Sequence, residues 1–209
     1  MLVIGLTGGI GMGKSAAAQH FARRGVPVFN ADSCVHALYE GEAVPAIEAE
    51  FPGVVRGGKV DRKLLSERVA GAPERLKRLE AIVHPMVVEA ELEFLREQEK
   101  KGAKLAVLEI PLLFETDAQT RVDVTIVVSA PAHVQRKRVL ARPGMTADKL
   151  EHLLARQLSD AERRARADYV VDSGTTHEDM HAQIDKIVES LKSRDGPVME
   201  RLRRPRPRK

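Results

Sequence analysis

The fold is decided by the stretch Gly8-Gly9-Ile10-Gly11-Met12-Gly13-Lys14-Ser15. It matches the pattern G-x-x-x-x-G-K-[ST] in the context that this pattern requires, between an apolar run at 2–6 and a helical stretch at about 14–24. At average residue usage, the bare pattern would occur by chance in roughly one chain of this length in a hundred. The stretch therefore predicts a strand, a phosphate-binding loop and a helix, in that order.

The residue types of this loop predict that it binds the phosphates of a nucleotide. Glycines let the backbone turn its N–H groups inward, and the N-terminus of the following helix adds partial positive charge. Lys14 is expected to reach the β- and γ-phosphates, and the Ser15 hydroxyl is expected to ligate Mg²⁺. A glycine-rich turn without a ligand would explain neither residue. The predicted ATP-binding residues are Gly9, Gly11, Met12, Gly13, Lys14, Ser15 and Ala16.

Outward from the loop, the chain predicts an α/β fold in which helices flank a five-stranded parallel P-loop sheet. Besides the run at 2–6, four short apolar runs are typical of strands, at 26–29, 105–110, 122–128 and 167–171. Strands buried on both faces form such continuous apolar runs. Residues 1–39, 103–134 and 167–193 are therefore assigned to a nucleotide-binding core.

Two helical segments interrupt this predicted core. Residues 40–102 place aliphatic side chains at helical spacing among charged ones, which predicts a helical insertion. Residues 135–166 are basic and helical with a break at Pro143-Gly144, which predicts a small lid. After the last strand, Thr175 and Glu178 predict a capping box for a closing helix that runs to about 191.

The C-terminal residues carry most of the positive charge. Residues 194–209 hold seven Arg/Lys against two acids, a formal charge of +5, so the total of +4 leaves −1 for residues 1–193. Pro197, Pro205 and Pro207 among these arginines predict a disordered basic tail. Because aromatic residues make up 3% with no Trp, few side chains could stack on bases, and no nucleic-acid partner is expected.

Length and composition favour a single cytoplasmic enzyme, expected to be a monomer. The 209 residues fit one domain with smaller insertions. The longest apolar stretch, 105–114, is much shorter than the ~20 residues of a membrane span, and no positive leader precedes the glycine-rich loop. Cys34 is the only cysteine, which excludes an intrachain disulfide and a Cys-cluster metal site.

A phosphate-binding loop alone does not distinguish a switch, a motor and a kinase. A GTPase switch would need N-K-x-D and D-x-x-G, and the sequence contains neither. A kinase needs an acceptor site, a base for the acceptor hydroxyl and cations that neutralise the transferred phosphoryl group.

Several side chains are candidates for these roles. Asp32 follows the second predicted strand, where it could serve as the base or as the N-cap of the next helix. Arg138 and Arg142 lie one helical turn apart in the lid and could bind phosphate oxygens. Glu109 ends the third strand and could hold a Mg²⁺-bound water. His84 precedes Pro85, which could simply end a helix.

Motifs along the chain, taken together, resemble the dephospho-CoA kinase family. They are L-T-G-G-I-G-x-G-K-S at 6–15, F-N-A-D-S at 29–33, G-K-V-D-R at 58–62, L-E-A-I-V-H-P at 79–85, E-I-P-L-L-F-E at 109–115, R-V-L-A-R at 138–142 and A-D-Y-V-V-D at 167–172. The resemblance spans roughly residues 1–190, and the H-P and P-L-L-F-E elements make it specific.

This resemblance implies that the chain transfers the γ-phosphate of ATP to the ribose 3′-hydroxyl of dephospho-CoA, with residues 40–102 as the acceptor-binding domain. It implies Asp32 as the catalytic base, Lys14 and Ser15 as the phosphate and metal ligands, and Arg138 and Arg142 as lid arginines. The implied acceptor-side residues are Asp32, His84, Pro111, Leu112 and Leu113.

The sequence departs from the family pattern at two places. Ala16 stands where many members have Thr, and Ser173-Gly174 stands where many have N-x-G. A nucleoside or nucleotide monophosphate kinase is an alternative within the same class. A nucleic-acid-associated ATPase that uses the basic tail is an alternative from a different class.

Overall fold

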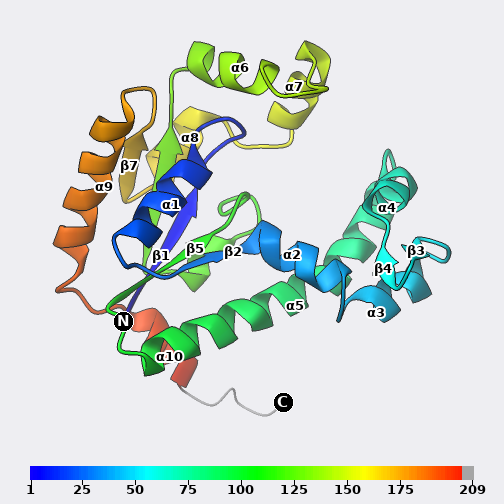
Figure 1. The fold of residues 1–209 in the computed structure, drawn as a ribbon, viewed down its shortest axis with the longest axis horizontal. Coiled ribbons are helices and arrows are strands. Elements are labelled where there is room, and N and C mark those ends of the chain that lie inside the picture. Colours follow the sequence, from blue (N-terminus) through cyan, green and yellow to red (C-terminus); the bar gives the residue numbers. More distant parts are fainter. Residues whose placement is uncertain (204–209) are drawn as a thin grey trace. The chain divides into compact units, whose positions relative to one another are not determined.

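The computed structural model describes residues 1–203, and a five-stranded parallel sheet with the order β2-β5-β1-β6-β7 lies at its centre (Figure 1). The strands are β1 (Leu2–Thr7), β2 (Val28–Asn30), β5 (Leu105–Glu109), β6 (Val124–Ser129) and β7 (Tyr169–Asp172). β1 pairs in parallel with β5 on one side and β6 on the other, and β6 pairs in parallel with β7. Each strand overlaps a predicted apolar run, so the predicted α/β fold is confirmed.

Helices α1 (Lys14–Arg23) and α9 (His177–Leu191) contact each other and share one buried cluster with the sheet (Figure 1). Phe21 of α1 and Ile184 of α9 belong to this cluster together with Ile4 of β1. β1 and β6 are buried along their whole lengths, as strands covered on both faces are. This packing fixes the start of α1 beside the carboxyl end of β1.

The N-terminus of α9 differs from the prediction by one residue. Thr176 is the N-cap, and its Oγ1 accepts a hydrogen bond from the Asp179 backbone N–H at 3.1 Å. The predicted capping box of Thr175 and Glu178 is therefore wrong. Thr175 instead donates to the Asp172 carbonyl oxygen, at 3.2 Å, in the turn after β7.

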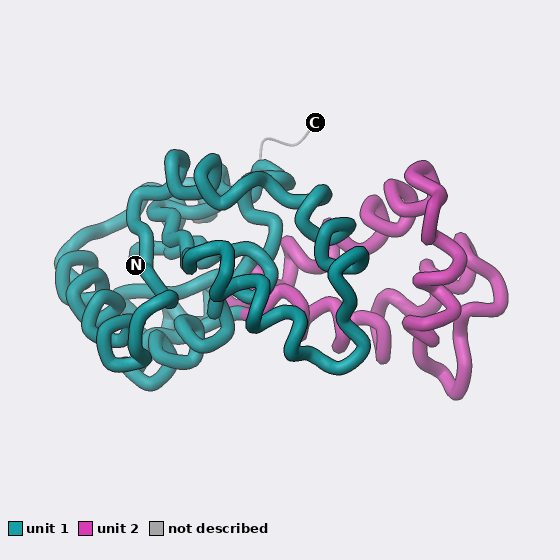
Figure 2. Tube along the Cα trace, turned by 90° about the horizontal axis from the view of Figure 1, so that it is seen from above, with its two compact units in different colours: residues 1–29, 95–209 teal, residues 30–94 magenta. Residues whose placement is uncertain are grey.

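Contacts within the chain separate a smaller unit, residues 30–94, from a larger unit that contains the sheet (Figure 2). The predicted insertion covered 40–102. The smaller unit begins earlier because α2 (Ala31–Tyr39) belongs to it, and it ends earlier because the last residues of α5 (Pro73–Lys100) belong to the larger unit.

The smaller unit also holds α3 (Val44–Glu50), α4 (Arg62–Val69) and a hairpin of β3 (Val55–Arg56) and β4 (Lys59–Val60), which the helical prediction missed. Gly57 and Gly58 both have positive φ, as a two-residue hairpin turn requires. The suggestion that Pro85 ends a helix is wrong, since α5 continues through it. No helix within residues 1–203 is long and apolar enough to cross a membrane.

The predicted lid at 135–166 contains α7 (Ala147–Leu154), α8 (Asp160–Arg166) and all of α6 (Ala132–Leu140) except its first three residues. The break at Pro143-Gly144 is confirmed, because it lies between α6 and α7. Since α6 already ends at Leu140, Arg142 lies in the turn beyond it. The prediction that Arg138 and Arg142 share one helix face is therefore wrong.

A short helix, α10 (Pro197–Arg203), occupies part of the predicted disordered tail. Its Val198 N–H donates to Asp123 Oδ1 at 2.8 Å, while Asp123 Oδ2 accepts from the Val3 N–H of β1 at 2.8 Å. Val198 and Met199 are buried. Proline is compatible with the first position of a helix, so the prediction is wrong for 197–203. Residues 204–209 lie outside the described part.

Candidate active site

The phosphate-binding loop lies between β1 and α1, as predicted. Gly11 and Gly13 have φ values of +75° and +87°, a region that other residues rarely adopt. Gly13 is also the N-cap of α1, which has no side-chain cap and no acidic residue in its first turn. The first N–H groups of α1 are therefore left for an anion, the arrangement that favours phosphate binding.

Lys14 and Glu109 form a nearly buried ion pair beside this loop. Lys14 Nζ lies 2.9 Å from Glu109 Oε1, and their side chains are 13% and 3% exposed. The two residues come from the carboxyl ends of neighbouring strands, because α1 follows β1 and Glu109 ends β5. Phosphate groups that bind Lys14 would therefore compete with a carboxylate for the ammonium group.

The Ser15 hydroxyl is exposed in the first turn of α1 and makes no hydrogen bond to the described residues. A hydroxyl oxygen is a suitable ligand for Mg²⁺, which commonly binds through one or two protein oxygens and the phosphates of its substrate. Ser15 therefore fits the metal role that its position in the motif predicts. No group of three or more His, Cys, Asp or Glu side chains within residues 1–203 could hold a metal ion.

Arg138 binds the loop that follows β7. Its two terminal nitrogens donate to Ser173, to the side-chain oxygen at 3.0 Å and to the backbone carbonyl at 2.6 Å. Ser173 Oγ in turn donates to the Met12 carbonyl oxygen at 2.6 Å. Ser173 therefore joins the lid to the phosphate-binding loop.

A pocket of about 170 Å³ adjoins this contact. It is lined by Gly13, Ala16, Arg138, Ser173, Thr175, Thr176, His177 and Met180. The replacement of Thr by Ala at position 16 leaves an apolar methyl group in this lining. The pocket is next to the first turn of α1, at the end of the loop opposite Gly9.

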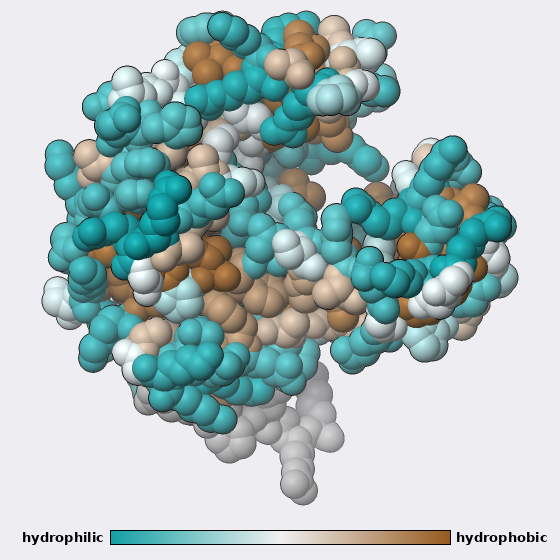
Figure 3. Space-filling model, viewed as in Figure 1, coloured by the Kyte–Doolittle hydropathy of each residue, from teal (hydrophilic) through white to brown (hydrophobic). Residues whose placement is uncertain are grey.

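The second predicted lid arginine is not part of this arrangement. The Arg142 side chain is exposed, and no hydrogen bond or ion pair joins that side chain to another residue within 1–203. Figure 3 shows apolar side chains among the charged ones over α6 and α7, where Leu140 and Leu153 are exposed. The structure therefore brings Arg138, but not Arg142, to the phosphate-binding loop.

Asp32 lies in the first turn of α2, directly after β2, and its side chain is exposed. The N-cap of α2 is Asn30, whose Oδ1 accepts a hydrogen bond from the Ser33 N–H at 2.7 Å. The interpretation of Asp32 as the cap is therefore wrong. His84 is exposed on α5, in the same unit as Asp32.

The three residues at 111–113 that were predicted to bind the acceptor differ in how exposed they are. Leu112 is 36% exposed, whereas Leu113 is fully buried and packs close to Gly5 of β1. Pro111 is half-buried, and its carbonyl oxygen accepts a hydrogen bond from Thr7 Oγ1 at 3.1 Å. Leu113 therefore anchors the segment to the sheet, and its role toward the acceptor stays a prediction.

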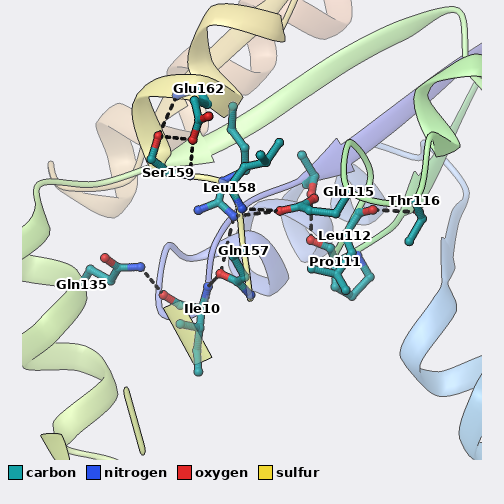
Figure 4. Close-up of polar contacts among 12 residues, drawn as sticks. Ile10, Pro111, Leu112, Glu115, Thr116, Gln135, Gln157, Leu158, Ser159 and Glu162 are labelled. Carbon is teal, nitrogen blue, oxygen red and sulfur yellow. Dashed lines mark hydrogen bonds and ion pairs between the residues drawn. The ribbon is translucent and has the colours of Figure 1, made fainter. Parts of the chain in front are cut away.

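Residues that sequence reasoning missed hold the start of the phosphate-binding loop (Figure 4). The Ile10 N–H donates to Gln157 Oε1 at 3.3 Å, and the Ile10 carbonyl accepts from Gln135 Nε2 at 2.8 Å. Glu115 Oε1 accepts from the Leu158 N–H at 2.9 Å. Glu115 ends the motif at 109–115, but no local pattern marks Gln135, Gln157 or these contacts, because each contact joins segments far apart in the chain.

Comparisons with known proteins agree with this geometry. A family model described as dephospho-CoA kinase matches residues 2–179. A dephospho-CoA kinase from Brucella melitensis is 56% identical over 191 residues, which cover 91% of this chain and 96% of that protein. One from Rhodopseudomonas palustris is 55% identical over 190 residues, covering 91% and 96%. The crystal structure of TT1252 from Thermus thermophilus is 36% identical with a TM-score of 0.81, covering 90% of this chain and 96% of that one.

Proposed function

The chain belongs to the dephospho-CoA kinase family, and we propose how its residues transfer the γ-phosphate of ATP to the ribose 3′-hydroxyl of dephospho-CoA. The products of this reaction are coenzyme A and ADP. The observation that carries the proposal is the uncapped N-terminus of α1, with Lys14 beside it. This arrangement supplies N–H donors and a cation for the phosphates of ATP.

Lys14 exchanges Glu109 for the β- and γ-phosphates when ATP binds. The Ser15 hydroxyl would hold Mg²⁺, which neutralises charge on the phosphates when it is bound. The adenine ring would occupy the pocket beside Ser173, with Arg138 on one wall. A planar guanidinium group stacks well on a flat ring system, which favours this position for the base.

Asp32 is proposed as the general base that accepts the proton of the acceptor hydroxyl. Its place directly after β2 supports this role, because ligands of such sheets bind at the carboxyl ends of the strands. Its carboxylate is exposed and does not cap α2. His84 and Leu112 are proposed to contact dephospho-CoA, and Arg142 is proposed to approach the phosphates only in the complex.

Release of ADP, measured with different acceptors, tests the function. We expect turnover with dephospho-CoA and little turnover with AMP, CMP or no acceptor. Preference for AMP or CMP would instead favour a monophosphate kinase. Stimulation by DNA or RNA without an acceptor would favour a nucleic-acid-associated ATPase. A monomeric state and a cytoplasmic location stay predictions, the first of which light scattering can test.

A further inference from the structure

Arg163 of α8 is a buried cation beside the phosphate-binding loop. Its side chain is 2% exposed. Its Nη2 atom lies 2.6 Å from the position that a Cβ atom on Gly9 would occupy. Since real side-chain carbons do not approach so closely, the guanidinium group uses the space that glycine leaves free at this position. Arg163 therefore packs directly on the backbone of the loop.

The carboxylates of Glu115, Asp160 and Glu162 act on the charge of Arg163, but none of them accepts a hydrogen bond from its guanidinium group within residues 1–203. Nη1 donates to Gln157 Oε1 at 3.4 Å and lies 3.7 Å from Glu115 Oε1, which is beyond ordinary hydrogen-bond distance. Within residues 1–203, the buried Nε atom of Arg163 and the Oε2 atom of Glu115 have no hydrogen-bond partner. A buried charge is costly unless it is paired and hydrogen-bonded, so this guanidinium group has unused capacity for an anion.

Two arginines contact opposite ends of the loop. Arg138 binds Ser173 and approaches the Gly11 carbonyl, beside the pocket proposed for adenine. Arg163 contacts Gly9 and lies near Glu115, which belongs to the 111–115 segment assigned to the acceptor side. The phosphate that is transferred must lie between nucleotide and acceptor. Arg163 is therefore at the end of the loop where the γ-phosphate is expected.

We propose that Arg163 is a catalytic residue that donates hydrogen bonds to the γ-phosphoryl oxygens of ATP during transfer. This proposal rests on the proposed function. In the transfer, the bond from the γ-phosphorus to the β,γ-bridging oxygen breaks, and its electron pair stays on ADP. The acceptor 3′-oxygen forms the new bond to phosphorus, and its proton passes to Asp32. Charge on the equatorial oxygens is neutralised by the buried guanidinium group.

Substitution of Arg163 by Met and by Lys tests this role. We expect Arg163→Met to lower kcat with dephospho-CoA by about 1000-fold, the lower end of the range known for arginines at transferred phosphoryl groups. Affinity for the ATP analogue AMP-PNP should fall on the order of tenfold, because one charge-assisted contact is lost. Affinity for ADP should change less than about twofold. Arg163→Lys should fall between Met and wild type, since lysine keeps the charge without the fork.

Arg166→Met is the matched control, because Arg166 is exposed on the same helix and should leave turnover unchanged. The melting temperature should fall in Arg163→Met, since the Glu115 carboxylate loses its nearby cation, so the comparison of the nucleotides is the decisive measurement. Should that variant fail to fold, Arg163→Lys gives the same nucleotide comparison.

Two results would overturn the proposal. One is kcat within tenfold of wild type with unchanged AMP-PNP affinity. The other is an equal loss of ADP and AMP-PNP affinity, which would make Arg163 a purely structural residue. A wild-type protein that does not phosphorylate dephospho-CoA would refute the proposed function, but the comparison of ADP with AMP-PNP would still test Arg163.

Discussion

Lys14 has a stability role besides its expected catalytic one, because its ammonium group neutralises the buried carboxylate of Glu109. We predict that Lys14→Met lowers turnover at saturating ATP by at least about a hundredfold and also lowers the melting temperature, since removal of one partner leaves a buried charge less compensated. Adding Glu109→Gln should restore the melting temperature but not the turnover. Retained turnover in Lys14→Met would contradict the assignment of the loop.

A substitution of Asp32 can test its role in catalysis separately from any role in stability. Because Asn30 is the cap of α2, Asp32→Asn should melt near the wild-type temperature. It should lose on the order of a hundredfold or more in kcat, since an amide cannot accept the hydroxyl proton. Asn30→Ala is the complementary control, and we expect it to cost about 1 kcal/mol of stability through the lost cap. Near-normal turnover in Asp32→Asn would leave the lysine, metal and arginines to carry the catalysis.

At the scale of elements, α10 is held to the sheet by Asp123 and by two buried apolar side chains. The double variant Val198→Ala with Met199→Ala should lower the free energy of unfolding on the order of 3 kcal/mol, as expected for truncated buried side chains. Turnover per folded molecule should not change, because Asp123 precedes the amino end of β6, away from the phosphate-binding loop at the carboxyl ends of the strands. Arg201→Ala, an exposed position on the same helix, should melt like wild type.

The contact between α1 and α9 should make stability depend on pH. His20 and His181 stack with ring centroids 3.9 Å apart, Asp185 lies 2.8 Å from His20, and Arg23 lies 3.2 Å from His181 Nε2. Desolvation, followed by the positive charges of His20 and Arg23 and the nearby His177, lowers the pKa of His181 below its usual 6.5, which Asp185 only partly offsets.

The unfolded chain therefore takes up a proton at His181 more readily than the folded chain does. Stability should fall as the pH decreases below about 6.5. We predict that the urea midpoint drops between pH 7.5 and pH 5.5, and that His181→Gln reduces this drop. His133→Gln, at an exposed position of α6, should leave the drop unchanged. A pH dependence that His181→Gln does not alter would assign the effect to another group.

At the scale of the whole molecule, the basic charge lies mainly near the C-terminus, and residues 1–193 carry a formal charge of −1. We predict that added DNA or RNA changes turnover with dephospho-CoA by less than about twofold at physiological ionic strength, where nonspecific phosphate binding is weak. The measurement is ADP release with and without nucleic acid. Strong stimulation would show that the C-terminal arginines couple to the active site.

Sequence patterns predicted those elements whose conformation depends mainly on residues close together in the sequence. The loop at 8–15 and the apolar strands could be identified because their residue types directly determine backbone shape and burial. Gly57-Gly58 carried an equally local hairpin signal that was missed, and Pro197 carried a helix-start signal that was read as a break. The contacts of Arg163 with Gly9 and of Gln157 with Ile10 could not be predicted, because they depend on how distant segments meet in the folded chain.

The two glutamine contacts to Ile10 have a thermodynamic consequence for nucleotide binding. Because Gln157 and Gln135 hold both backbone polar groups of Ile10, this part of the loop is already ordered before ATP arrives. Fixing the backbone of one residue costs about 1–2 kcal/mol in conformational entropy. For Ile10 this entropy is already lost when the chain folds, before ATP binds. The association of ATP should therefore carry a smaller entropic penalty than it would with a loop that orders only around its ligand.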